Sequence, residues 1–388
     1  MTVCAIEITT TARFTIAADG AYAARLAGEG QARYPERWTL GGPEPYAVPL
    51  PLGQPEEADS EVLPLADGRV LIHRRVADRH AFALLYPSGA AGGPRTGELP
   101  LGSVAAEEGV RVRLLPPSPD GHGAFALAVG PGRSTLWQVA GIPGGPRRAA
   151  TLPGRCSGGV WLDRIGRLLA LDHELDGRTK AVAVDLARGG EVSPLLQIAE
   201  DSDDRLLLAA PDSGLLLIRS DAPGEPRLGW GVLGSTRPVR FPECLRIEDA
   251  HPFAVQPGQA LMPETCGVAL RVGESGLAVW RPGDRYVFRL GTPVGWLGTG
   301  LWSAEGRLHL PYTTPEVPCG LVGLTPPAAP PPQSRPWPPA VQEPAGLDPV
   351  GADPAGADPV GADPAGPDPR LRAEPAPRPV PLQQAPLG

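Results

Sequence analysis

Residues 115–145 read LPPSPDGHGAFALAVGPGRSTLWQVAGIPGG, and this stretch decides the fold. It contains a turn at Gly121, an apolar run, a loop, a second apolar run around Trp137 and a GG turn. Another apolar run, VRLLPP, precedes the turn. Short apolar runs separated by glycine and proline turns are typical of antiparallel hairpins.

The same turn followed by an apolar run recurs along the chain, about every 48 residues. Most units continue with a third apolar run, often containing a tryptophan, and then a fourth. Four short strands per unit of this length are typical of propeller blades. The sequence therefore predicts an all-β, seven-bladed β-propeller over residues 1–324. The turn glycines are Gly20, Gly68, Gly121, Gly166, Gly214, Gly258 and Gly306.

Two units leave details open. In the sixth unit the first hairpin fits either Gly258 or Gly273. The seventh unit has three strands, and residues 3–9, VCAIEIT, alternate apolar and polar side chains. We expect this N-terminal strand to complete the last blade, because ring closure removes exposed sheet edges. It would also bring Cys4 near Cys319, as free thiols or as a disulfide.

The composition changes abruptly near residue 325. Residues 325–388 are proline-rich, and residues 346–370 form five GxDPx pentapeptides. Frequent proline removes backbone donors, and there is too little apolar surface for a core. We therefore predict a disordered C-terminal tail. It could act as a solvated spacer or as a docking segment, with residues 375–382 the best candidate.

Charge and cysteine content indicate which classes of partner and which cellular compartment to expect. The formal net charge is -8, which argues against nucleic acid as a general partner. The five cysteines form no CxxC pair, which favours a reducing compartment. The start of the chain has no signal-peptide pattern, and no apolar stretch is long enough to span a membrane. We expect a monomeric cytoplasmic propeller without a membrane partner.

The units resemble the repeats of TolB-like and WD40-like propellers. The SPDG turn, apolar strand, LWQV strand and GG turn of residues 115–145 carry this resemblance, and residues 161–190 repeat it with DRIG as the turn. The resemblance implies a binding platform. Similar blades also form the lid of prolyl oligopeptidase-like peptidases, but this chain contains no G-x-S-x-G motif.

The loops that enter four of the blades are acidic. If these loops meet at one end of the central channel, they form a negative funnel for a cation, an amine or a basic protein segment. Polar surface loops are also the ordinary case. The twelve carboxylates are those of Glu56, Glu57, Asp59, Glu61, Glu107, Glu108, Glu200, Asp201, Asp203, Asp204, Glu248 and Asp249.

A second candidate is the run Asp172-His173-Glu174-Leu175-Asp176-Gly177, which is similar to the start of a calcium loop. The closing glutamate of such a loop is replaced by Ala183. The run has two interpretations: a site for a divalent cation on Asp172, Glu174 and Asp176, or a solvated turn between two strands. No cofactor motif and no nucleophile in a recognisable setting was found.

We therefore predict a non-enzymatic binding or scaffold propeller whose partner is a protein or a small cationic ligand. Its recognition residues would be among Glu61, Glu108, Asp203, Asp204, Glu248 and Asp249. The alternative is a propeller hydrolase or lyase with its site at the channel mouth. Carboxylates or histidines converging in a deep channel would favour the enzyme. An apolar channel with a polar rim would favour binding.

Overall fold

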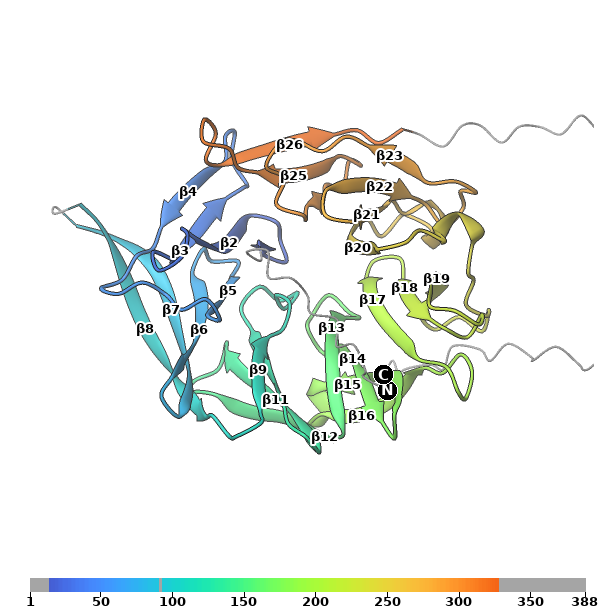
Figure 1. Ribbon diagram of the computed structural model, residues 1–388, viewed down its shortest axis with the longest axis horizontal. Helices are drawn as coiled ribbons and strands as arrows, with labels where there is room; N and C mark the ends of the chain where they lie inside the picture. Colours follow the sequence, from blue (N-terminus) through green and yellow to red (C-terminus); the bar gives the residue numbers. More distant parts are fainter. Residues whose placement is uncertain (1–13, 91–92, 328–388) are drawn as a thin grey trace, which may run out of the picture. The chain divides into compact units, whose positions relative to one another are not determined.

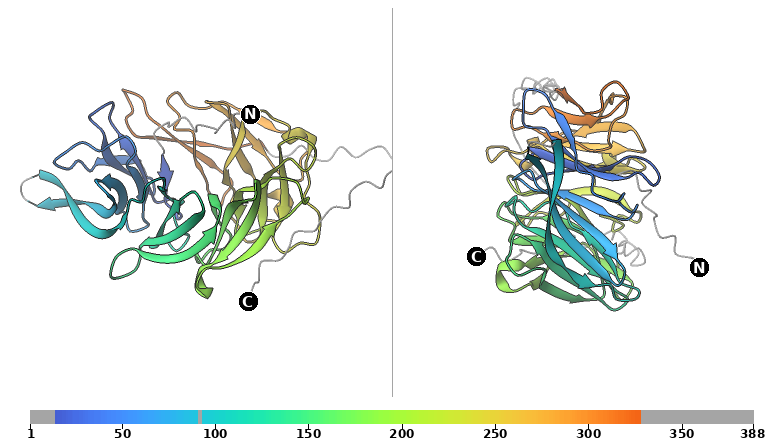
Figure 2. Two further views of the ribbon diagram at one scale, coloured as in Figure 1. Left: turned by 60° about the horizontal axis from the view of Figure 1, so that its bottom comes forward. Right: turned by 90° about the vertical axis from the view of Figure 1, so that its left-hand side faces the viewer.

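The computed structural model describes residues 14–90 and 93–327 of the chain (Figure 1). The described residues form seven antiparallel sheets arranged around a common centre, which confirms the predicted seven-bladed propeller. In each sheet the strands follow chain order from the centre outward. The long hairpin of the second sheet extends beyond the outer strands of its neighbours (Figure 2).

The strands fall into blades as follows. The first three blades consist of β1 (Thr15–Ile16), β2 (Tyr22–Ala27), β3 (Tyr34–Thr39) and β4 (Tyr46–Pro49); β5 (Glu61–Pro64), β6 (Val70–Val76), β7 (Arg79–Ala90) and β8 (Gly93–Ala105); and β9 (Arg111–Leu114), β10 (Ala124–Val129), β11 (Arg133–Ala140) and β12 (Arg147–Pro153). The fourth and fifth blades consist of β13 (Arg155–Trp161), β14 (Leu168–Leu175), β15 (Arg178–Asp185) and β16 (Glu191–Leu196); and β17 (Asp204–Ala210), β18 (Leu215–Ser220) and β19 (Arg227–Val232). The last two consist of β20 (Ala250–Val255), β21 (Val268–Val272), β22 (Gly276–Trp280) and β23 (Phe288–Leu290); and β24 (Leu301–Trp302), β25 (Leu308–Tyr312) and β26 (Gly320–Leu324).

The recurring glycines have one conformational role. Each of the seven lies between the first and second strands of its blade, with φ between +71° at Gly166 and +147° at Gly258. Glycine adopts positive φ without the steric cost that a Cβ atom imposes. The repeat in the sequence therefore records a backbone requirement of the hairpin that begins each blade.

Apolar packing between neighbouring blades holds the ring together. Seven buried apolar clusters occur among the described residues, and each joins two consecutive sheets. Four tryptophans lie on third strands and pack in these clusters: Trp38, Trp137, Trp230 and Trp280. In the cluster between the seventh and first blades, Trp38 and Phe14 pack with Leu301 and Leu321.

Two blades depart from the predicted strand pattern. In the sixth blade, the run after Gly258 is not a strand, because residues 256–267 form a long loop that contains the 3₁₀ turn η3 (Pro263–Thr265). In the fifth blade, the predicted fourth run around residues 238–241 makes one bridge, between Trp230 and Arg240. Prolines 238 and 242 flank this bridge, and proline cannot donate to a ladder.

The predicted closing strand at residues 3–9, with Cys4, lies outside the described residues, as does the predicted tail beyond residue 327. The helical segments of the described residues are three short 3₁₀ turns: η3, η1 (Leu186–Arg188) and η2 (Glu243–Leu245). In this part of the chain, no helix has the length and apolar character needed to cross a membrane.

Candidate binding site in the central channel

A cavity of about 1540 Å³ occupies the centre of the ring. Every blade contributes its first strand or an adjacent loop to the wall, because the first strands lie nearest the centre. The wall is mostly built from small and apolar side chains and prolines. Its larger apolar side chains include Ile16, Val62, Leu115, Val160, Leu208, Phe253 and Leu301.

Charged side chains gather where the first strands begin. Asp59 and Glu61 lie at the start of β5, and Glu29 and Arg33 lie in the loop between β2 and β3. Antiparallel connectivity puts both segments at the same end of the channel. We call these four residues the entry mouth. Arg113 on β9 also lines the channel, so three carboxylates stand against two guanidiniums. The remaining excess of one negative charge favours a positively charged group.

Glu61 connects the entry mouth to a buried histidine pair. Its Oε2 accepts the Leu114 N–H of the next blade at 2.6 Å and lies 3.6 Å from Nδ1 of His73. Nε2 of His73 lies 2.9 Å from Nδ1 of His80, and both histidines are buried. Burial lowers the pKa of His80, with His73 and Arg75 adding to this effect.

The acidic entry loops do not converge as a group. Asp59 and Glu61 line the channel, whereas the other ten carboxylates do not. Glu108 and Glu248 are exposed, and Asp249 accepts a hydrogen bond from Nε2 of His251 at 2.9 Å.

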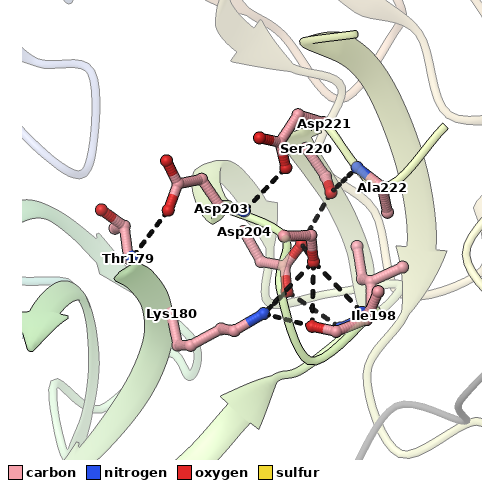
Figure 3. Close-up of polar contacts among 10 residues, drawn as sticks. Thr179, Lys180, Ile198, Asp203, Asp204, Ser220, Asp221 and Ala222 are labelled. Atoms are coloured by element: carbon pink, nitrogen blue, oxygen red, sulfur yellow. Dashed lines mark hydrogen bonds and ion pairs between the residues drawn. The ribbon is translucent and has the colours of Figure 1, made fainter. Parts of the chain in front are cut away.

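Asp203 and Asp204 lie at the junction of the fourth and fifth blades (Figure 3). Asp203 accepts the backbone N–H of Thr179 at 2.8 Å. Asp204 is 0 % exposed, and its carboxylate lies 2.8 Å from Nζ of Lys180. It also accepts hydrogen bonds from the Ile198 N–H and from the hydroxyls of Ser202 and Ser220. These contacts turn both carboxylates toward the blade junction, so neither is available to a channel ligand.

The residues of the calcium-like run do not come together. Asp172 and Glu174 lie within β14, and Asp176 lies in a two-residue hairpin turn with φ +52°. Asp172 is buried against the fifth blade, while Glu174 and Asp176 are exposed. Among the described residues, no group of three His, Cys, Asp or Glu side chains is arranged to hold a metal ion. The alternative interpretation, a turn between two strands, describes this segment.

Asp172 is instead a titratable group in the junction of two blades. Its Oδ1 accepts the Leu206 N–H at 3.0 Å, and its Oδ2 lies 3.7 Å from Nη1 of Arg205. Burial raises the pKa of Asp172 to about 6, although the Leu206 hydrogen bond and the charges of Arg205 and Arg113 act in the opposite direction.

This shift predicts a pH-dependent stability. The folded protein holds the Asp172 proton more tightly than the unfolded chain does. The stability that this proton contributes is therefore fully present below about pH 4 and is lost as the pH rises through about 6. As the pH rises from about 4 to about 7, the unfolding free energy of Asp172→Asn should increase, relative to that of the unaltered protein, by on the order of 2–3 kcal/mol. Urea denaturation across this range measures it, with exposed Glu174→Gln as the control. Parallel stability curves for Asp172→Asn and the unaltered protein would contradict the prediction.

The histidine pair was missed by sequence reasoning. His73 and His80 flank a tight turn between β6 and β7 that leaves Val76 opposite Arg79. This register places the two rings diagonally across the ladder, where long side chains can touch. The seven-residue spacing around a predicted hairpin was the available signal.

Comparisons with known proteins show a likeness of fold only. No family model matches the sequence, and none of the curated proteins does. Among solved structures, this chain is similar to a puromycin hydrolase at 17% identity and a TM-score of 0.54, over 81% of this chain and 51% of that one. It therefore spans about half the length of that hydrolase.

Two further structures represent the propeller types that the repeats resemble. Sqt1 of Chaetomium thermophilum, bound to the N-terminus of a ribosomal protein, has 11% identity and a TM-score of 0.44, over 77% of this chain and 81% of that one. TolB of Acinetobacter baumannii has 12% identity and a TM-score of 0.40, over 81% of this chain and 85% of that one. The chain is a seven-bladed β-propeller, and the motifs of its repeats resemble those of TolB-like and WD40-like propellers.

Proposed function

We propose that this protein is a non-enzymatic binding propeller that receives an extended, basic segment of a partner protein in its central channel. The observation that carries the proposal is the channel itself, which is lined mostly by small and apolar residues and has carboxylates at the entry mouth. Such a site suits a lysine or arginine side chain, which combines an apolar stem with a charged head.

The entry mouth supplies the electrostatic part of this recognition. Glu29, Asp59 and Glu61 outnumber the two guanidiniums that line the channel, those of Arg33 and Arg113. Arg33 donates to the Gly30 carbonyl at 2.7 Å, and Arg113 donates to the Gly158 carbonyl at 2.6 Å. A low-dielectric wall strengthens the interaction between these carboxylates and an entering cation. Specificity would then come from how the rest of the segment fits the apolar wall.

The competing function is that of a hydrolase or lyase. The likeness to a puromycin hydrolase is a likeness of fold, and fold alone does not determine activity. Against catalysis stands the wall composition, since small and apolar residues make up most of the described lining of the channel. Turnover of an added peptide is therefore an outcome that the binding experiment must be able to detect.

The test uses fluorescent twelve-residue peptides of mixed sequence with one fixed central arginine, and matched peptides with glutamine there. We expect the arginine set to bind, and Glu61→Gln to weaken binding about tenfold, or ~1.4 kcal/mol. Leu208→Trp, which places a larger side chain on the channel wall, should weaken binding at least as much. Glu108→Gln is the control, because Glu108 is acidic and exposed but does not line the channel.

Anisotropy measures the affinity, and mass spectrometry of the same samples detects cleavage. Absence of binding, or binding that is insensitive to Leu208→Trp and Glu61→Gln, would overturn the proposed function. Cleavage of the peptides by the unaltered protein, lost in Glu61→Gln, would establish the enzymatic alternative.

A further inference from the structure

The buried pair of His73 and His80 lies directly behind the entry mouth. Glu61 lines the channel and also faces Nδ1 of His73 at 3.6 Å, and the two imidazoles are 2.9 Å apart. The pair is enclosed, since His73 is 4% exposed and His80 is 6% exposed. A carboxylate at a binding site is thus in electrostatic contact with two buried imidazoles.

Glu61 selects the tautomers of the neutral pair. If His73 donated from Nε2, its bare Nδ1 would direct a lone pair at the Glu61 carboxylate. If His80 donates from Nδ1 instead, His73 carries its proton on Nδ1 and presents an N–H to the carboxylate. The second arrangement is favoured, and at 3.6 Å the contact with Glu61 is electrostatic rather than a formed hydrogen bond.

The same geometry fixes where an added proton resides. A proton from water binds Nε2 of His80, the Nδ1 proton of His80 passes to Nε2 of His73, and His73 becomes an imidazolium facing Glu61. The net change is the uptake of one proton: two N–H bonds form, at Nε2 of His80 and at Nε2 of His73, and one breaks, at Nδ1 of His80. The Glu61 charge stabilises this state, whereas burial of the two rings opposes it.

The other charges around the pair come from three strands and one loop. Asp59 precedes β5 and favours protonation of His80, whereas Arg75 on β6 disfavours it. Arg113 lies on β9 of the next blade, where its Nη2 donates to the Gly158 carbonyl at 2.6 Å. Arg74 is directed to Glu56 and Glu98 through ion pairs of 2.7 and 2.6 Å.

We infer that binding of a cation at the entry mouth is coupled to release of a proton from the His73–His80 pair. A cation beside Glu61 compensates the charge that stabilises the imidazolium, so ligand and proton compete. The coupling is reciprocal. Protonation of the pair must lower the affinity for the cation by the same factor by which the bound cation lowers the affinity for the proton. The inference rests on the proposed function, and it makes the channel a pH-sensitive binding site.

The test is calorimetric titration of the unaltered protein with the arginine peptides, in two buffers of different ionisation enthalpy. Arginine itself does not titrate in this range. We expect release of up to about one proton per peptide at the acid end of the range and none near pH 8, with affinity falling up to about tenfold per pH unit in acid. Asp19→Asn is the matched control, because Asp19 also lines the channel but does not contact the pair.

Two failures can be told apart. Peptide that binds with equal heats in both buffers throughout pH 5–8 overturns the coupling and leaves the proposed function standing. Peptide that fails to bind overturns the proposed function. NMR of the imidazole nitrogens in the free protein then tests the contacts alone: Glu61→Gln should lower the protonation midpoint of the pair by about one pH unit, and an unchanged midpoint overturns the inference.

Discussion

Replacing Lys180 with methionine is expected to lower the free energy of unfolding by about 3–5 kcal/mol. Lys180 is the cationic partner of Asp204, whose carboxylate is fully buried at the junction of the fourth and fifth blades (Figure 3). Without it, Asp204 keeps three neutral donors, the Ile198 N–H and the hydroxyls of Ser202 and Ser220. Neutral donors do not fully compensate an ionised carboxylate held away from water.

The double variant Lys180→Met, Asp204→Asn separates the cost of an unpaired charge from the worth of the pair. The asparagine Oδ1 can accept either from the Ser202 and Ser220 hydroxyls or from the Ile198 N–H, because these donors contact different oxygens of Asp204. The double variant contains no buried charge, so we expect it to be more stable than Lys180→Met alone. Urea denaturation measures all three proteins. If Lys180→Met costs less than about 1 kcal/mol, the pair behaves as a surface ion pair and the burial argument fails.

The fold could be predicted because its signal is a backbone requirement repeated seven times. A positive φ in each first hairpin demands glycine, and glycine is visible in the sequence. Strand edges were less predictable where tertiary context decides them. Proline at positions 238 and 242 reduces the fourth strand of the fifth blade to one bridge, and Phe241 packs against Gly229 there.

The candidate site could be predicted in part. Glu61 was identified and lines the channel, but Asp204 was identified for the same reason and is buried in a junction. A sequence shows that a loop is acidic and does not show which carboxylates its own backbone and neighbours will occupy. The apolar wall and the His73–His80 pair depend on contacts between strands that local patterns do not specify.

Replacing Trp38 with alanine should destabilise the protein by about 3–5 kcal/mol, the usual cost of removing a buried tryptophan. Trp38 is 0% exposed, and its ring meets Phe14 edge-on at 4.8 Å. Its Nε1 donates to Glu36 at 2.7 Å, and Arg25 lies 5.2 Å from the ring centre. Trp38→Phe keeps much of the apolar contact and loses the hydrogen bond, so it should cost less than the alanine variant.

The position of Trp38 in the ring makes a second effect measurable. Its cluster joins the first blade to the seventh, which are far apart in the sequence, whereas Trp280 is equally buried between the consecutive fifth and sixth blades. A short connection keeps consecutive blades close even when their packing weakens. The first and seventh blades are separated by most of the chain, so their contact must overcome a large loop-closure entropy. Trp38→Ala should therefore accelerate hydrogen exchange selectively in β2 and β26, and Trp280→Ala should not. Equal exchange in the two variants would mean that the closing junction is no weaker than the others, and that the ring opens as one cooperative unit.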